Sequence, residues 1–499
     1  MSSEVPKRQF RLTAGVLLAG LIVIAAALRF LRLGNWSFDS DETFTLRDSV
    51  GIDPSNPRPL LYLLNHYLLG PLLPLDEFGL RLLPAVFGVL AIPAFYFVAR
   101  RLVGTRAALF GSLLLTFSGL HVYYSQFGRY WSLVFLLATV YPFAIYLGLR
   151  DHNRRMLALG VVTGVAAVLA HPVSVLLLGG LVPWILATYL RPDQLSRLRS
   201  HRRVIWVGLF VGILAVVIAT QFVPMLQGWV YQADTKRTPS EFLLHVPGKQ
   251  GLKQIVYMFV FMESLTIPVT LAGALGIVLL WQGRDRSLAV LLASMFVVPA
   301  VFLVLVSLRA PVGVFYLVPT IPIVFIGAGV FLDRLAAIDA GLRPRWLFAA
   351  GVTLMIIAAG APTLISQYRD GRRYDFRGAA KWLQKELEPA DVVYSDQIMV
   401  MKHYLPEARI ERLRANPEPL AATVRAQHAS GQGALWIISP APAHAFRTNP
   451  HLGILKQWMY GHCQLRNTFG VGRMDFRQYY LQLYQCHAVM PRDAVANSE

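Results

Sequence analysis

The chain has 499 residues, of which 55% are hydrophobic, and its mean hydropathy is +0.49. This apolar share exceeds that of an ordinary soluble domain and predicts a membrane protein with many spans. A net charge of +19 would fit a nucleic-acid partner, but most of the excess basic residues fall in short loops between apolar runs. Anionic lipid headgroups account for basic residues in such loops, so we exclude nucleic acid and expect membrane lipids as partners.

Eleven apolar runs are long enough to cross roughly 30 Å of hydrocarbon. They lie at 12–33, 80–101, 106–126, 130–149, 156–172, 173–190, 204–226, 260–281, 287–308, 314–333 and 346–365. The first run is too long for a cleaved signal peptide and lacks a small-residue cleavage site, so we expect it to be a retained helix.

Lysine and arginine distribute unevenly over the segments between these runs. With the N-terminus inside, inner segments carry 19 of them and the short outer loops carry eight. Positive residues concentrate on the cytoplasmic side, so this bias predicts a cytoplasmic N-terminus. An odd number of spans then places the C-terminal region outside the cytoplasmic (inner) membrane of a bacterium.

An acidic pair, Asp41 and Glu42, follows the first span in the stretch GNWSFDSDETFTLRDS. A carboxylate at this boundary stays ionised, while the neighbouring low-dielectric wall strengthens its interaction with a cation or a lipid-linked group. The pair is therefore a candidate for chemistry. The alternative is a local structural role, in which Asp39 or Ser40 caps a short helix and Glu42 favours its positive end.

Further polar residues are predicted at the same membrane face. They are Arg58 in the first outer loop, Arg81 at the start of the second span, His121, Tyr123, Tyr124, Gln126, Arg129 and Tyr130 between the third and fourth spans, and His171 between the fifth and sixth. Arginine can fork onto phosphate oxygens while a carboxylate takes a proton from a hydroxyl, so acids plus arginines fit transfer from a phosphorylated lipid donor. Interface anchoring by the arginines, an aromatic belt of tyrosines and a turn contact by His171 are the alternatives.

Residues 367–499 change to mixed polar sequence and predict a small soluble α/β domain. Helical patterns at 376–387 and 419–430 alternate with strands at 391–396 and 434–439, and two β-like stretches end the chain. The two cysteines of the protein, Cys463 and Cys486, fall on the predicted oxidising side, which favours a disulfide between them. Two free thiols, or a zinc site with His462 and His487, are the alternatives.

The stretch that begins EFGLRLLPAV and ends at Arg150 resembles the conserved body of the family 39 type of lipid-donor glycosyltransferases, which have the GT-C fold. This type includes protein O-mannosyltransferases and the aminoarabinose transferase that modifies lipid A. Later, FYLVPTIPIVFIGAGVFL and YDFRGAAKWLQKELEPADVVYSD resemble its final spans and small outer domain. An Asp-Glu pair in the first outer loop carries the catalytic base of the family, and the resemblance gives that role to Asp41.

Two motifs depart from the family pattern. In NPRPLLYLL, Arg58 stands where the family has proline and Pro57 where it has a basic residue, so Arg58 would supply the charge from one position away. The turn QFGRYWS lacks the acid and the proline of the family but keeps Arg129.

These observations lead to one hypothesis of architecture and activity. We expect an all-α polytopic membrane domain of the GT-C type over 1–366, with a catalytic first outer loop at 34–79, followed by the extracytoplasmic α/β domain over 367–499. The activity would be transfer of a sugar (hexosyl or pentosyl) from a polyprenyl-phosphate donor to a hydroxyl of a lipid, glycan or protein. A transporter or flippase of lipid-linked sugars and a surface-polysaccharide polymerase or ligase are the alternatives.

Each candidate residue has an expected role. Asp41 removes the acceptor proton and Glu42 orients the acceptor or Asp41. Those expected at the donor phosphate are Arg58, Arg81, Arg129 and His171, with Arg81 and His171 at the donor entrance, and Tyr124 and Tyr130 are expected in the substrate pocket. No cofactor is indicated, although a divalent metal is compatible with the chemistry.

Overall fold

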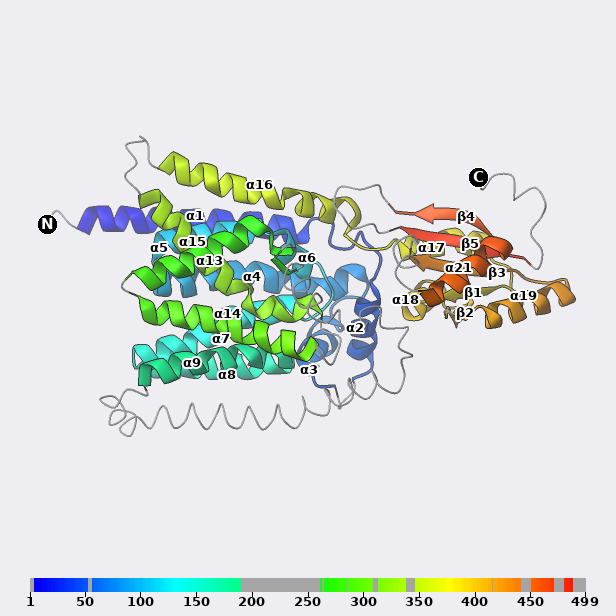
Figure 1. Cartoon of the computed structure of the whole chain (residues 1–499), viewed down its shortest axis with the longest axis horizontal. Coiled ribbons are helices and arrows are strands. Elements are labelled where there is room, and N and C mark those ends of the chain that lie inside the picture. Colours follow the sequence, from blue (N-terminus) through cyan, green and yellow to red (C-terminus); the bar gives the residue numbers. More distant parts are fainter. Residues whose placement is uncertain are drawn as a thin grey trace.

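The computed structural model describes residues 4–52, 56–189, 261–262, 264–283, 285–307, 313–337, 346–414, 416–440, 450–470 and 480–487. A bundle of helices forms one end of the molecule, and a sheet covered by helices forms the other (Figure 1). The short helices of the first loop lie at the end of the bundle that faces the sheet domain, so this loop sits between the two parts.

The bundle helices are α1 (Glu4–Phe30), α4 (Glu77–Val103), α5 (Thr105–Thr116), α6 (Gly119–Ser125), α7 (Trp131–Arg150), α8 (Arg154–Ala170), α9 (Leu176–Tyr189), α13 (Ile267–Gln282), α14 (Arg286–Ser307), α15 (Ile321–Ala337) and α16 (Trp346–Asp370). Each predicted span overlaps one of them, except 106–126, which is the pair α5 and α6, and 204–226, which lies outside the described residues. The spans at 173–190 and 314–333 begin in the 3-10 helices η2 (Pro172–Val175) and η4 (Val314–Thr320).

The chain is therefore a multi-pass membrane protein, but its described helices support fewer spans than predicted. Six of them are long and apolar enough to cross a membrane, or seven if α5 and α6, bent by 63° at their junction, count as one span. Helices α9 and α13 are apolar but shorter. One predicted span, 204–226, lies outside the described residues. Among the described ones, α8 ends before its apolar run does, and α9 and α13 are shorter than theirs, because an apolar run does not reveal where its helix bends or ends.

The bundle helices differ in how deeply they are buried. In α7 and α15, 83% of the most apolar stretch of the helix is buried, so both lie at the centre of the bundle. The corresponding share is 22% in α1 and 17% in α16, which lie at its rim. The central helices approach closely where side chains are absent: a Cβ on Gly276 of α13 would lie 1.8 Å from the carbonyl oxygen of Gly327 of α15. Small residues permit such backbone contact, which replaces the hydrophobic driving force that lipid does not supply.

The first loop contains α2 (Ser40–Val50), α3 (Pro59–Leu64) and the single π-helical turn η1 (Asn65–Leu69). Asp39 begins α2 with a capping box: its carboxylate accepts the Asp41 N–H at 3.1 Å, and the Glu42 carboxylate accepts the Asp39 N–H at 3.0 Å. The capping role considered for Asp39 is thus observed. Pro59 starts α3, where its missing N–H costs nothing.

The C-terminal part contains a five-stranded sheet in the order β2-β1-β3-β5-β4. Its strands are β1 (Val392–Ser395), β2 (Arg409–Arg412), β3 (Leu435–Pro440), β4 (Cys463–Phe469) and β5 (Leu481–Cys486), and its helices are α17 (Phe376–Glu386), α18 (Ile398–Tyr404), α19 (Glu418–Ser430) and α21 (Pro450–His462). Strand β1 pairs in parallel with β2 and β3, while β5 is antiparallel to β3 and β4.

Alternate side chains of β1 serve two cores. Val393 packs with α17 and α18 on one face, and Val392 and Tyr394 pack with α19 and α21 on the other. The result is a three-layer α/β/α domain, which belongs to the α/β class that the alternation of patterns predicted. Helices α18 and α21 and strand β2 were not predicted.

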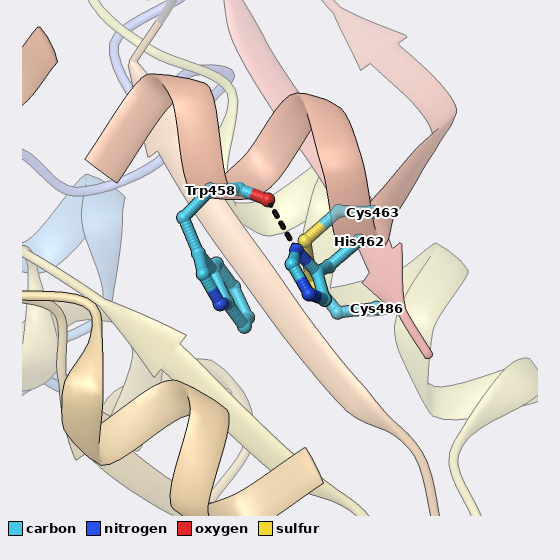
Figure 2. The surroundings of a disulfide bond; sticks show 4 residues. All are labelled: Trp458, His462, Cys463 and Cys486. Atoms are coloured by element: carbon cyan, nitrogen blue, oxygen red, sulfur yellow. Dashed lines mark hydrogen bonds between the residues drawn. A yellow bond between two sulfur atoms is a disulfide. The ribbon is translucent and has the colours of Figure 1, made fainter. Parts of the chain in front are cut away.

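Cys463 and Cys486 form a disulfide between register partners of β4 and β5 (Figure 2). The ring of His462 stacks on Trp458, with centroids 4.8 Å apart, and its Nδ1 lies 2.9 Å from the Trp458 carbonyl oxygen. Because both sulfurs are bridged, neither is the thiolate that a zinc site here would need.

The sheet domain docks on the first loop through a small set of contacts. The Tyr404 hydroxyl of α18 accepts the Phe38 N–H at 2.7 Å and donates to Glu77 Oε1 at 2.7 Å. Arg377 of α17 pairs with the same Glu77 carboxylate at 3.2 Å. These contacts tie the loop of Asp41 to the C-terminal domain. Helix α16 leads into this junction and runs four residues past the predicted boundary at 366.

Candidate functional site

Asp41 lies in the first turn of α2, and its side chain is 45% exposed. Arg129 approaches it from the turn between α6 and α7: the guanidinium Nε is 3.9 Å from Asp41 Oδ2. Arg129 Nη1 also donates to the Asp41 carbonyl at 3.1 Å and to Thr45 Oγ1 at 3.2 Å. Arg129 therefore fixes the first turn of α2 and leaves the Asp41 carboxylate open to solvent.

A second guanidinium joins this pair through a shared phenol. Arg58 Nη1 donates to the Tyr130 hydroxyl at 2.9 Å, and Arg129 Nη2 donates to the same oxygen at 3.3 Å. Burial opposes the charge of Arg129, but Tyr130 and Asp41 outweigh it and hold the pKa of Arg129 above its ordinary value. Two cations held beside one phenol form a site that favours an anion.

Three buried polar atoms around these two arginines make no hydrogen bond with the described residues. In the described part of the chain, Arg58 Nε, Arg129 Nε and the Tyr62 hydroxyl are buried without a hydrogen-bond partner. Burial also raises the pKa of Tyr62 and keeps it neutral, so its hydroxyl can donate. Buried donors are rarely left unmet, and a phosphate group would accept from all three.

Aromatic rings form a wall beside these cations. The ring of His171 lies 4.8 Å from that of Tyr130, 5.0 Å from Trp131 and 5.7 Å from Tyr316, between centroids. His171 Nδ1 accepts the Val173 N–H at 3.1 Å, so the neutral ring carries its proton on Nε2.

The structure thus brings together five predicted residues: Asp41, Arg58, Arg129, Tyr130 and His171. Tyr124, expected in the substrate pocket, lies next to this group and not within it. Its ring centroid is 6.2 Å from that of Trp131, which in turn lies beside Tyr130 and His171.

Glu42 occupies a different environment from Asp41. Its side chain is fully buried, and its carboxylate accepts from Arg81 Nε and Nη2, Arg373 Nη1 and the Gly128 N–H, each at 2.7 Å, besides the capping bond from Asp39. Burial alone would raise the pKa of Glu42, but Arg373 and Arg81 lower it to about 2. This buried cluster joins the first loop, α4, the Arg129 turn and the segment after α16.

The cluster corrects two expected roles. Arg81 also donates to the carbonyls of Leu33, Trp36 and Ser37, so all five of its N–H groups are used and its side chain has no exposed surface. Arg81 therefore has no donor left for a phosphate and is a structural partner of Glu42. Glu42 is likewise too buried to touch an acceptor, and orientation of Asp41 through α2 is the role that fits its position.

Several residues of the site were missed from the sequence. Tyr62 follows Arg58 by four residues, and Trp131 follows Tyr130 directly, so helical spacing and adjacency could have indicated both. Tyr316 and Arg373 come from distant segments, and no local pattern connects them to the first loop.

No group of three or more His, Cys, Asp or Glu side chains within the described ranges could hold a metal ion.

Residues 64–220 match the model of the dolichyl-phosphate-mannose-protein mannosyltransferase family. The resemblance drawn from the sequence is confirmed. The chain is a glycosyltransferase of the GT-C type. Arg81, Arg129, Tyr130 and His171 of this glycosyltransferase fall inside the matched range, and Asp41 precedes it.

Solved structures share the fold of the glycosyltransferase over most of its length. ArnT from Cupriavidus metallidurans is 17% identical in its apo state, with 98% of this chain and 100% of that chain covered and a TM-score of 0.50. The same protein bound to undecaprenyl phosphate is 16% identical, with 97% and 99% covered and a TM-score of 0.50. The apo oligosaccharyltransferase of Archaeoglobus fulgidus is 11% identical, with 91% and 73% covered and a TM-score of 0.56. A comparison with curated protein sequences gave no match.

Proposed function

We propose that this glycosyltransferase moves a sugar from a polyprenyl-phosphate donor to an acceptor hydroxyl at the outer face of the cytoplasmic membrane. The observation that carries this proposal is an exposed carboxylate, Asp41, beside Arg129, which Tyr130 links to Arg58. The Nε atoms of both arginines are buried and make no hydrogen bond to any residue that the structure describes. The undecaprenyl phosphate bound to ArnT, which shares the fold, supports a donor of this chemical class. The orientation rests on the bias of lysine and arginine between loops.

In the proposed reaction, the acceptor oxygen forms a bond to the anomeric carbon of the sugar while the bond from that carbon to the phosphate oxygen breaks. The acceptor proton passes to the Asp41 carboxylate, which is exposed enough to reach a hydroxyl. The electron pair of the broken bond leaves on polyprenyl phosphate.

The leaving phosphate meets the two guanidiniums. Arg58 and Arg129 stabilise the charge that develops on it, and Tyr62 donates to a remaining oxygen. A phosphate leaves without protonation, so the site needs no general acid. One displacement of this kind inverts the configuration at the sugar carbon.

Two measurements together test this function. Purified protein in lipid vesicles should release polyprenyl phosphate from a synthetic polyprenyl-phosphate sugar when an acceptor extract is present. Mass spectrometry of lipids, envelope glycans and proteins from cells with and without the gene should show loss of the mass of one sugar, which names both sugar and acceptor. Loss of a whole oligosaccharide would assign a ligase instead, and no lost mass together with no released phosphate would reject the proposal.

A further inference from the structure

A second polar cavity lies between the membrane bundle and the C-terminal domain, apart from the proposed donor site. Its volume is about 350 Å³, and it shares none of its lining residues with the cluster around Asp41 and Arg129. The lining comes from the loop before α2 with Asn35 and Trp36, from the last turn of α16 and the segment that follows it, from the first turns of α17, and from Gly470 directly after β4.

Basic side chains predominate in this lining. Arg369, Arg373, Arg377 and Lys381 line the cavity, against two acids, Asp370 and Asp375. Each arginine already has an acidic partner: Arg369 pairs with Asp370 at 2.8 Å, Arg373 with Glu42 and Arg377 with Glu77.

Lys381 differs from these arginines. It is exposed, and within the described part of the chain it has neither an ion pair nor a hydrogen bond. The Asp375 carboxylate accepts the Gly378 N–H at 2.8 Å as the cap of α17 and is occupied there. The three arginines are thus neutralised by their acidic partners, and Lys381 is the basic side chain of the lining that is ready for an anionic ligand.

The surroundings of the cavity favour a lipid over a soluble anion. Arg369 stands in the last turn of α16, and Ile365, four residues earlier on the same helix face, is 50% exposed. Leu31, which directly follows α1, is 55% exposed. Exposed apolar side chains thus stand one turn before the cavity on α16 and at the end of α1, where the acyl chain below an anionic headgroup would lie.

We propose that this cavity binds the phosphate headgroup of an anionic membrane lipid from the adjoining leaflet, with Lys381 as its principal contact. The bound headgroup bridges α16 and α17 at the seam of the two domains. It also lies beside Arg373, whose guanidinium holds Glu42 and through it the first loop.

Lipid retention by the full-length protein tests this proposal. Native mass spectrometry after exchange into equimolar phosphatidylglycerol and phosphatidylcholine should show phosphatidylglycerol retained in preference. One lysine near a lipid surface contributes about 1 kcal/mol, so Lys381→Gln should weaken that retention about fivefold. Lys381→Arg should preserve it, and so should the matched control Lys385→Gln, one turn further along α17, exposed and outside the cavity lining.

Three outcomes would overturn the lipid site. They are no preference for phosphatidylglycerol, equal losses in Lys381→Gln and Lys385→Gln, and displacement of the lipid by inorganic phosphate at the same concentration. The last outcome would assign the cavity to a soluble anion. None of these readouts depends on transferase activity, so they stand apart from the proposed function.

Discussion

Replacing Glu42 with glutamine should destabilise the glycosyltransferase strongly, although Glu42 makes no contact with a substrate in the proposed mechanism. The two carboxylate oxygens accept five N–H groups from Arg81, Arg373, Gly128 and Asp39. Glutamine keeps the size of the side chain but turns one acceptor into an NH₂ group that faces these donors. It also leaves the charges of Arg81 and Arg373 buried without a counter-ion.

Two estimates of the magnitude agree. Breaking a buried ion pair by removing one partner costs about 3–5 kcal/mol. Independently, the pKa of Glu42 falls from 4.5 to about 2 on folding. Since a tenfold change in proton affinity corresponds to about 1.4 kcal/mol, that fall is worth roughly 3 kcal/mol of stability.

The same fall fixes the pH dependence of this contribution. Because the pKa is lower in the folded state, the stabilisation is complete above pH 4.5 and is lost as the pH falls from 4.5 towards 2. The stability difference between the parent protein and Glu42→Gln should therefore be constant at neutral pH and shrink through this acidic window.

Thermal unfolding of the detergent-solubilised protein, followed by tryptophan fluorescence, measures the effect. The matched control is Asp151→Asn, which breaks an exposed pair with Arg150 whose side chains are 49% and 38% exposed, and which should cost at most about 1 kcal/mol. An apparent Tm for Glu42→Gln as high as that of Asp151→Asn would refute the reasoning that this buried cluster holds the first loop.

Three further results are expected. Arg58→Ala should weaken binding of the polyprenyl-phosphate donor by roughly 10- to 100-fold in a titration, because the phosphate loses a charge-assisted donor. The control Arg47→Ala, at an exposed position, should leave the donor affinity unchanged. If Arg58→Ala binds the donor as tightly as the parent protein, Arg58 does not belong to the donor site. Opening the bridge between Cys463 and Cys486 should cost about 3 kcal/mol and speed proteolysis of the C-terminal domain alone, whereas labelling of both thiols in unreduced protein would deny the bridge. A reporter fused after Glu499 should be active only outside the cytoplasm, and a cytoplasmic signal would reverse the proposed orientation.

The sequence could predict those features that depend on short-range pattern. Hydropathy located the described spans, short apolar strand patterns located β1 and β3, and helical patterns located α17 and α19. Strand β2 escaped because it has only four residues and reads RIER, with polar or exposed side chains at both ends. Helix α18 escaped because its seven residues are too few for a helical period to stand out.

Residues of the site divide in the same way. Asp41 and Arg129 could be chosen from the sequence because each stands in a loop at a membrane boundary. The burial of Arg81 could not be foreseen, because its position at a span end is equally typical of an interface anchor. What decides its role is Glu42, with Arg373 as the third member, 331 residues further along the chain. Only the folded structure brings these three charges together.

Asp41→Asn tests the central claim most directly. The variant keeps the shape of the side chain but removes the carboxylate that would accept the acceptor proton. With saturating polyprenyl-phosphate sugar, purified Asp41→Asn protein should transfer sugar roughly 10²- to 10⁴-fold more slowly than the parent, while its donor affinity stays unchanged. Asp48→Asn, on the same helix and engaged with Arg47 and Asn56, serves as the matched control and should retain the parental rate. Transfer by Asp41→Asn at the parental rate would contradict the assignment of Asp41 as the general base.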